Sequence, residues 1–245
     1  MTFNKILFAL LFFTFSVLSL SEASAQTCNP TAAFSYTNDD GEAIVDEEAE
    51  NYSGSAPVKG VFRANPDGVD DYAARYEWVI YESTKSDEVI VHRFDENLEY
   101  TFLHSGSFIV ELKATFVLDG DTIAYPAEGE KPATFSVSVK QSQLEMPNAF
   151  SPNGDSWNNT YRVKKHQSIV EFKATIFNRW GQKLYSWDDV NGEWDGKVNG
   201  KVVKDGVYFV NVVAKGADGR VYHIRKDINV LTRIESTGGD NGGTE

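Results

Sequence analysis

Residue types used in catalysis occur in this chain, but their spacing builds no active site that we recognise. The histidines stand far apart, and none has a second histidine or a cysteine at metal-site spacing. The sequence has no Gly-x-Ser-x-Gly elbow, no glycine loop to hold a phosphate ahead of a helix, and no thiol in a catalytic setting. Adjacent carboxylates, such as Asp70 with Asp71, indicate solvated surface in a chain with 36 Asp and Glu. We therefore expect no enzymatic activity. The histidines are His92, His104, His166 and His223.

One loop has the composition of a weak cation site. Asn153, Asp155, Asn158 and Asn159 place hard oxygen donors close together, and calcium prefers such ligands. Only Asp155 carries a charge. We therefore expect Asx turns that satisfy their own backbone, and keep calcium bound by Asn153, Asp155 and Asn158 as the second interpretation. No other cofactor is expected.

The N-terminus has the pattern of a secretory signal peptide, residues 1–25. Lys5 precedes an apolar run from Ile6 to Leu20, and Ala23-Ser24-Ala25 has the small-x-small form of a cleavage site. The apolar run is shorter than the ~20 residues that a membrane-spanning helix needs. We expect an exported chain that is not an integral membrane protein.

Cys28 is the single cysteine, so no internal disulfide can form. Ala25, Gln26 and Thr27 lack the small and apolar residues that precede a lipidated cysteine. We expect an unpaired thiol near a flexible terminus, able to form an intermolecular bridge.

Charge and composition favour a soluble, exported, all-β protein. The net charge of −13 and pI near 4.8 argue against a nucleic-acid partner, because phosphates would be repelled. The roughly 220 residues that remain after signal removal are enough for two domains.

The C-terminal part, residues 146–235, has the pattern of a small β-sandwich. Segments 170–176 and 222–230 alternate apolar and polar residues, with Lys226 as the exception. We expect Trp180, Trp187 and Trp194 to fill a small core and brace turns. Dipeptides that supply positive φ separate the strands and leave no room for a helix: Asn191-Gly192, Asp195-Gly196, Asn199-Gly200, Asp205-Gly206 and Asp218-Gly219.

Four motifs in this part are similar to a known family. They are NAFSPNGD at Asn148–Asp155, FNRWG at Phe177–Gly181, WDG at Trp194–Gly196 and GVY at Gly206–Tyr208. Their order and spacing resemble the gliding motility-associated C-terminal domain, the type B sorting domain of the type IX secretion system. The resemblance implies export to the cell surface or the medium, with the type IX translocon and an outer-membrane barrel as partners. Candidate recognition residues are Asn153, Gly154, Asp155, Arg179, Trp180, Gly181, Trp194, Asp195, Gly196, Gly206, Tyr208 and Lys226.

The N-terminal part, residues 26–140, has the pattern of an immunoglobulin-like sandwich. Segment 107–118 alternates without a break, and segments 72–81, 89–94 and 134–139 follow the same period. Edge strands are expected around Phe34 and Phe62, and a solvated loop is expected over the acidic stretch 38–51. The sequence thus predicts two consecutive immunoglobulin-like β-sandwiches.

Segment 100–116, with Gly106 and Phe108, resembles the polycystic kidney disease (PKD) repeat. The loop after Trp78 departs from that family, so we infer a divergent member and transfer no ligand from it. A short polar linker is expected at residues 141–145, ahead of Pro147. The glycine-rich tail, residues 236–245, is expected to be disordered.

Three functions are compatible with these patterns. The first is a non-enzymatic structural or adhesive surface protein, with a glycan or a host protein as its ligand. The second is an accessory component of the type IX secretion or gliding apparatus, since the sorting domain is almost half of the mature chain. The third, an enzyme, has no residue pattern to support it.

Overall fold

The computed structural model describes residues 27–38, 41–155 and 157–232. All secondary-structure elements in this part of the chain are β-strands. This confirms the predicted all-β class and the predicted pair of β-sandwiches. The predicted signal peptide and the predicted disordered tail lie outside the described residues. Over the residues described, no helix is long and apolar enough to cross a membrane.

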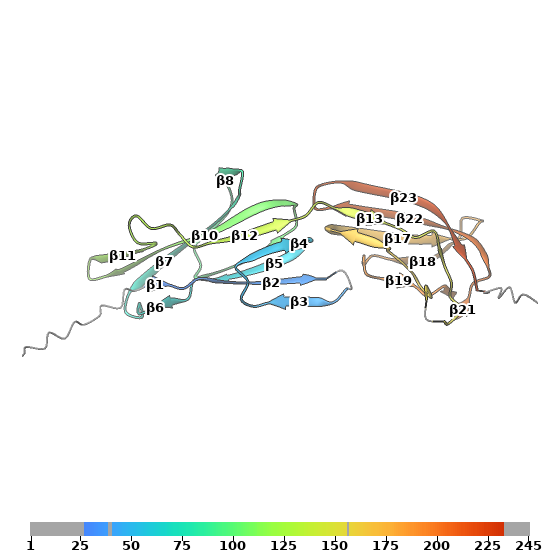
Figure 1. Ribbon diagram of the computed structural model, residues 1–245, viewed down its shortest axis with the longest axis horizontal. Coiled ribbons are helices and arrows are strands. Elements are labelled where there is room, and N and C mark those ends of the chain that lie inside the picture. Colours follow the sequence, from blue (N-terminus) through green and yellow to red (C-terminus); the bar gives the residue numbers. More distant parts are fainter. Residues whose placement is uncertain (1–26, 39–40, 156, 233–245) are drawn as a thin grey trace, which may run out of the picture.

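The N-terminal sandwich contains twelve strands. They are β1 (Thr27–Cys28), β2 (Thr31–Thr37), β3 (Ala43–Asp46), β4 (Asn51–Gly54), β5 (Val58–Arg63), β6 (Pro66–Asp67), β7 (Ala73–Glu82), β8 (Lys85–Arg93), β9 (Asn97–Phe102), β10 (Gly106–Leu118), β11 (Asp121–Tyr125) and β12 (Thr134–Val139). One sheet has the order β3-β2-β5-β9, and the other has the order β4-β12-β10-β7-β8 with β11 paired to β10 (Figure 1).

Two sequence predictions about this half are wrong. The strands around Phe34 and Phe62, β2 and β5, are central in their sheet rather than at its edges. The acidic stretch 38–51 is not simply a solvated loop, because it contains β3, which pairs with β2. Both errors arise because local composition indicates how exposed a segment is, but not which strands pair with it in the sheet.

Aromatic side chains fill the N-terminal core. Trp78 and Phe62 are fully buried, with ring centroids 6.1 Å apart. The Trp78 indole N–H donates to the Glu96 carbonyl at 3.1 Å, so its polar atom is satisfied. The inward residues of β10 complete the core, as the strict period of that strand predicts.

Cys28 is an unpaired thiol, as predicted, but it is buried in this core, so the prediction that it is available for an intermolecular bridge is wrong. Its exposed fraction is 4%, and β1 is held by antiparallel pairing with β6. Burial, with a smaller contribution from the charge of Glu96, raises the pKa of the Cys28 thiol to about 11.

We expect native Cys28 to react with a thiol reagent at pH 8 at least about 100-fold more slowly than the unfolded chain, because the thiolate is the reactive form. The pKa of the folded thiol lies above the ordinary value of 9.0. The raised pKa of Cys28 therefore contributes to the free energy of unfolding below pH 9, and this contribution is lost as the pH rises from 9 through about 11. Reagent kinetics with and without denaturant measure the ratio. Equal rates would show an open thiol.

The C-terminal sandwich contains the remaining strands. They are β13 (Gln143–Glu145), β14 (Ala149–Phe150), β15 (Tyr161–Arg162), β16 (Lys165–Gln167), β17 (Ile169–Phe177), β18 (Lys183–Trp187), β19 (Glu193–Trp194), β20 (Lys197–Val198), β21 (Lys201–Val202), β22 (Gly206–Gly216) and β23 (Val221–Val230). The main sheet has the order β14-β23-β22-β17-β18, and three short pairs, β13-β16, β15-β19 and β20-β21, lie apart from it.

The tryptophans of this half do not share one role. Trp194 is fully buried and Trp187 is 8% exposed, as predicted for core residues. Trp180 is 77% exposed, so the prediction that it packs in the core is wrong. It lies in the turn between β17 and β18, where no facing strand can cover it.

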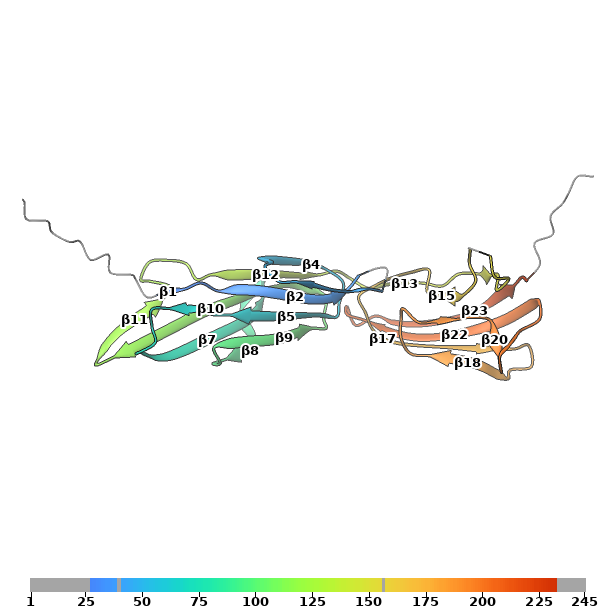
Figure 2. The ribbon, with the colours of Figure 1, turned by 90° about the horizontal axis from the view of Figure 1, so that it is seen from below.

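The two sandwiches lie end to end (Figures 1 and 2). Hydrogen bonds hold the chain segment that connects them. Residues 141–145, where the sequence predicts a polar linker, contain β13. Ser142 is buried, and its hydroxyl donates to the Asp218 carboxylate at 2.6 Å. Further hydrogen bonds cross the junction, from Ala56 N to Ser168 Oγ at 3.2 Å and from Ser105 N to the Ala217 carbonyl at 3.0 Å.

Candidate functional site

The Trp-Asp-Gly motif forms the centre of an aromatic cluster. The Trp194 ring lies 5.3 Å from Phe150, which belongs to the first motif, and 6.1 Å from Tyr208, which belongs to the last. The Trp194 indole N–H donates to the Lys197 carbonyl at 3.0 Å, and the Tyr208 hydroxyl donates to the Lys204 carbonyl at 2.9 Å. Three motifs that are distant in sequence therefore meet around one buried indole.

The turn that follows Trp194 is held by Asp195. One carboxylate oxygen accepts from the Lys197 backbone N–H, and the other contacts the Lys197 ammonium, both at 2.9 Å. The bond to the Lys197 side chain is the main reason that the pKa of Asp195 lies below its usual value. Gly196 has φ +75°, and an added Cβ would lie 2.9 Å from Pro152. Asp195 and Gly196 thus have structural roles in the turn.

Gly206 also has a positive φ, +144°, as predicted, but an added Cβ would meet nothing within 4 Å. Gly192 lacks the positive φ that its Asn-Gly dipeptide predicts. A Cβ there would instead lie 2.8 Å from Trp187, so close packing requires that glycine.

We expect Gly196→Ala to destabilise the C-terminal domain by about 2–4 kcal/mol, because it adds a steric overlap with Pro152 to backbone strain. Gly200→Ala is the matched control: its φ is +77° and the space around it is open, so it should cost only about 1 kcal/mol. Urea denaturation of both variants measures the difference. Equal losses would show that the contact with Pro152 is easily relieved.

The loop at 153–159 forms the predicted Asx-turn network. Asp155 Oδ1 accepts from the Trp157 backbone N–H at 2.8 Å, and Oδ2 accepts from the Asn153 amide at 2.7 Å. Asn159 Oδ1 accepts from the Gly154 N–H at 2.7 Å. The two bonds that Asp155 accepts, first that from Trp157 and then that from Asn153, hold the pKa of Asp155 below its usual value.

This geometry does not fit a calcium site. Both Asp155 oxygens already accept hydrogen bonds, and the Asn153 amide directs its nitrogen, not its oxygen, at the carboxylate. Across the described part of the chain, no group of three or more His, Cys, Asp or Glu side chains is placed to hold a metal ion. We therefore derive no role for calcium.

The Phe-Asn-Arg-Trp-Gly motif forms the β17–β18 turn. Asn178 Oδ1 accepts from the backbone N–H groups of Trp180 and Gln182, both at 3.0 Å, so the asparagine shapes the turn. The Arg179 guanidinium lies over the Trp180 ring, 4.5 Å from its centroid. The stacked pair points into solvent and has no structural role in the core.

Arg179 and Gly181 also line a shallow depression of about 570 Å³ on the outer face of the main sheet. Phe177 and Phe209, which face each other across β17 and β22, contribute its apolar part. Phe209 is 43% exposed. Lys226 also lines the depression. Its ammonium donates to the Met146 carbonyl at 3.0 Å, which explains why a lysine occurs in an inward-facing row.

Six of the sequence-predicted recognition residues fall into two sets. Trp194, Asp195, Gly196 and Tyr208 build the fold, whereas Arg179 and Trp180 are free to contact a partner. No motif in the sequence marked Phe209 or the 77% exposed Trp157 as a surface residue available to a partner. The alternation around Gly206–Tyr208 could have placed Phe209 on the outer face, but nothing in the pattern marks that face as uncovered.

The family comparison agrees with this geometry. Residues 144–223 match the model of the family described as the CHU_C type IX secretion signal domain. The predicted sorting domain is therefore confirmed: this part of the chain is a type IX secretion signal domain. The match implies export through the type IX system, to the cell surface or the extracellular space. The PKD resemblance of the N-terminal part stays a prediction.

Solved structures offer only distant similarity. Dimeric latent PorU from Porphyromonas gingivalis is 13% identical with a TM-score of 0.25, over 84% of this chain and 20% of that chain. A tetra-tandem repeat from the extending region of a large adhesion protein is 13% identical with a TM-score of 0.27, over 85% of this chain and 69% of that chain. The chain thus spans about a fifth of the PorU length. No curated protein matches the sequence.

Proposed function

We propose that this chain is a non-enzymatic surface protein whose C-terminal domain is a folded export signal and whose N-terminal sandwich is the structural or adhesive cargo. The observation that carries the proposal is the convergence of separate motifs on one folded domain, with Arg179 and Trp180 left exposed beside the open sheet face. Junction contacts such as Ser105 to Ala217 support transport of the two sandwiches as one unit. The partner of the signal is the translocon at the outer membrane.

A second candidate is an accessory component of the secretion or gliding apparatus. The near-equal size of the two sandwiches favours it, because an export signal that only delivers cargo would usually be smaller than the cargo domain. Purification from the native bacterium separates the candidates. An outer-membrane barrel recovered at fixed stoichiometry supports the accessory role, whereas glycan or host-matrix binding by the N-terminal sandwich supports the adhesive role.

We expect Arg179→Ala and Trp180→Ala to reduce the surface-exposed fraction several-fold while the melting temperature changes by less than about 2 °C. Surface substitutions away from structural features rarely change stability by more than about 0.5 kcal/mol. Lys201→Ala is the matched control, because Lys201 is an exposed cation in the β20–β21 hairpin of the same domain. Fractionation of the native bacterium gives the exported fraction. Normal export of both variants would remove this pair from the recognition surface.

A further inference from the structure

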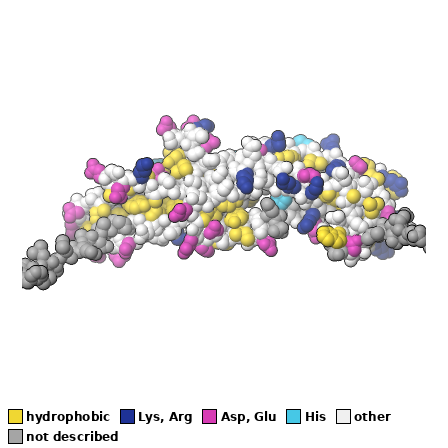
Figure 3. All heavy atoms as spheres, viewed as in Figure 1, with side chains coloured by type: hydrophobic (Ala, Val, Ile, Leu, Met, Phe, Trp, Pro, Cys, Tyr) yellow, Lys and Arg dark blue, Asp and Glu magenta, His cyan; other side chains and the backbone are white. Residues whose placement is uncertain are grey.

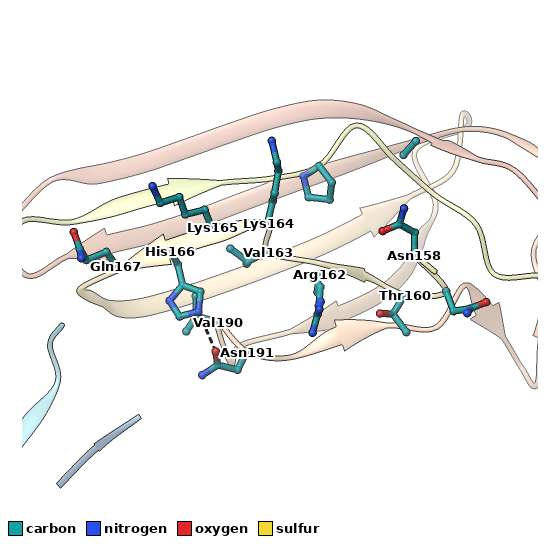
Figure 4. Close-up of a pocket in the computed structure, with 13 residues that line it drawn as sticks. Asn158, Thr160, Arg162, Val163, Lys164, Lys165, His166, Gln167, Val190 and Asn191 are labelled. Atoms are coloured by element: carbon teal, nitrogen blue, oxygen red, sulfur yellow. Dashed lines mark hydrogen bonds between the residues drawn. The ribbon is translucent and has the colours of Figure 1, made fainter. Parts of the chain in front are cut away.

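The C-terminal domain contains a polar groove that the sorting motifs barely touch (Figure 4). Its volume is about 710 Å³, within the range of ligand sites. The segment 158–167 forms most of its wall, with Val190 and Asn191 beside it and Pro147 and Ala149 at another side. No Phe, Tyr or Trp side chain lines the groove, so its lining offers mainly charged and hydrogen-bonding groups to a ligand.

The cations of this groove differ in their partners. Lys164 pairs with Glu145 at 2.6 Å, and His166 Nε2 hydrogen-bonds to Asn191 Oδ1 at 3.0 Å. Arg162 and Lys165 are exposed and have no carboxylate within ion-pair distance among the residues described. Glu145 faces Lys165 and Glu193 faces Arg162 across their strand pairs. The pKa of Glu145 is lowered mainly by Lys164, with a smaller contribution from Lys165. Neither Arg162 nor Lys165 forms a close ion pair, so both ends can reach a ligand.

Charge is distributed unevenly along the chain, and the groove lies in its basic part. Residues 27–140 contain 22 Asp and Glu against 8 Lys and Arg, whereas residues 141–232 contain 10 against 13. The stretch 156–170 has four basic side chains, counting His166, and no acidic one. Figure 3 shows the same division, with acidic side chains mostly over the N-terminal half and basic ones gathered over the C-terminal half. Because charges more than about 8 Å apart are largely screened at physiological salt, the acidic domain does not cancel this local field.

The arrangement of the two free cations favours an extended ligand. Arg162 and Lys165 are three positions apart, and Figure 4 shows their side chains leaving the backbone in different directions. A single small anion would contact one of them, whereas anionic groups spaced along a chain would contact both. The remaining polar lining, from Asn158, Thr160 and Asn191, consists of amides and a hydroxyl. Such groups bond to sugar hydroxyls, which both donate and accept.

We propose that this groove binds a linear acidic polysaccharide, with Arg162 and Lys165 contacting its carboxylate or sulfate groups. Binding here would hold the exported protein on an acidic glycan layer, independently of recognition by the translocon. The contact is electrostatic and polar, so its affinity falls as salt rises.

The test is calorimetry on the mature full-length protein with sodium polygalacturonate, dextran sulfate and neutral dextran at 50 and 300 mM NaCl. We expect at least one acidic polymer to bind, with weaker binding at the higher salt, and neutral dextran not to bind. The carboxylated and sulfated polymers distinguish the two sources of charge. The double variant R162Q/K165Q should weaken binding at least about tenfold. The matched variant K173Q/K183Q, which removes two exposed cations from the main sheet, should stay within about twofold.

Several results would overturn the proposal. They are binding of neither acidic polymer, equal weakening by both double variants, or unchanged binding by R162Q/K165Q. Displacement of the polymer by inorganic phosphate, at a phosphate concentration equal to that of the polymer's charged groups, would indicate a site for a single anion instead. Equal binding of poly-L-glutamate would show that the groove does not select a polysaccharide. Thermal melts of both variants are the folding control, and the single variant K165Q replaces the double one if its melting temperature falls.

Discussion

Replacing Trp194 with alanine should lower the free energy of unfolding of the C-terminal domain by about 3–5 kcal/mol, the usual cost of removing a buried aromatic side chain. The indole is fully buried, contacts Phe150 and Tyr208, and donates to the Lys197 carbonyl. Its removal leaves a cavity where three motifs meet and an acceptor without its donor. Denaturant unfolding followed by circular dichroism measures the loss.

Trp180→Ala is the control for this experiment, since the same side chain is lost from a position that is 77% exposed. It should change the free energy of unfolding by less than about 0.5 kcal/mol. Loss of export in both variants, with loss of stability only in the first, would separate a folding requirement from a contact with the translocon. Equal stability of Trp194→Ala and the wild type would contradict the view that the motif builds the core.

Deletion of residues 141–245 should leave the N-terminal sandwich folded but retained in the periplasm, with at least about a tenfold drop in the surface-exposed fraction. The N-terminal core around Trp78 lies within the retained part, so the fold should persist. Some loss of stability is expected, because Ala217 packs against that core and Ser168 accepts from Ala56. Fractionation and a thermal melt of the truncated protein give the two quantities. An unfolded truncated protein would make the export result a folding defect, so the melt is required.

The positions of the long strands were the feature of this fold that the sequence predicted best. The alternation in 107–118 specifies β10 because a side chain on every second residue must face the core. Sheet order was not predictable in the same way, since β2 and β5 become central only through pairing with β3 and β9. Cys28 illustrates the same limit: its burial depends on strands far away in the sequence, which no local pattern reveals.

The motif residues of the sorting domain were predictable as a set, but not in their roles. Gly196 and Trp194 look like recognition residues in a motif, yet contacts with Pro152 and Phe150 explain them as parts of the core. Lys226 breaks an apolar row because its ammonium reaches a carbonyl of the chain itself. Packing does not explain the exposed pair Arg179 and Trp180, and recognition by the translocon stays a prediction for this pair.

The central claim is that the C-terminal sandwich alone carries the export information. Fusion of residues 141–245 behind a periplasmic reporter, with its own signal peptide, tests this claim most directly in a bacterium with a working type IX system. We expect the reporter at the cell surface or in the medium, and in the periplasm of a secretion-deficient strain. A reporter that stays in the periplasm of both strains, although the fused domain is folded, would contradict the account.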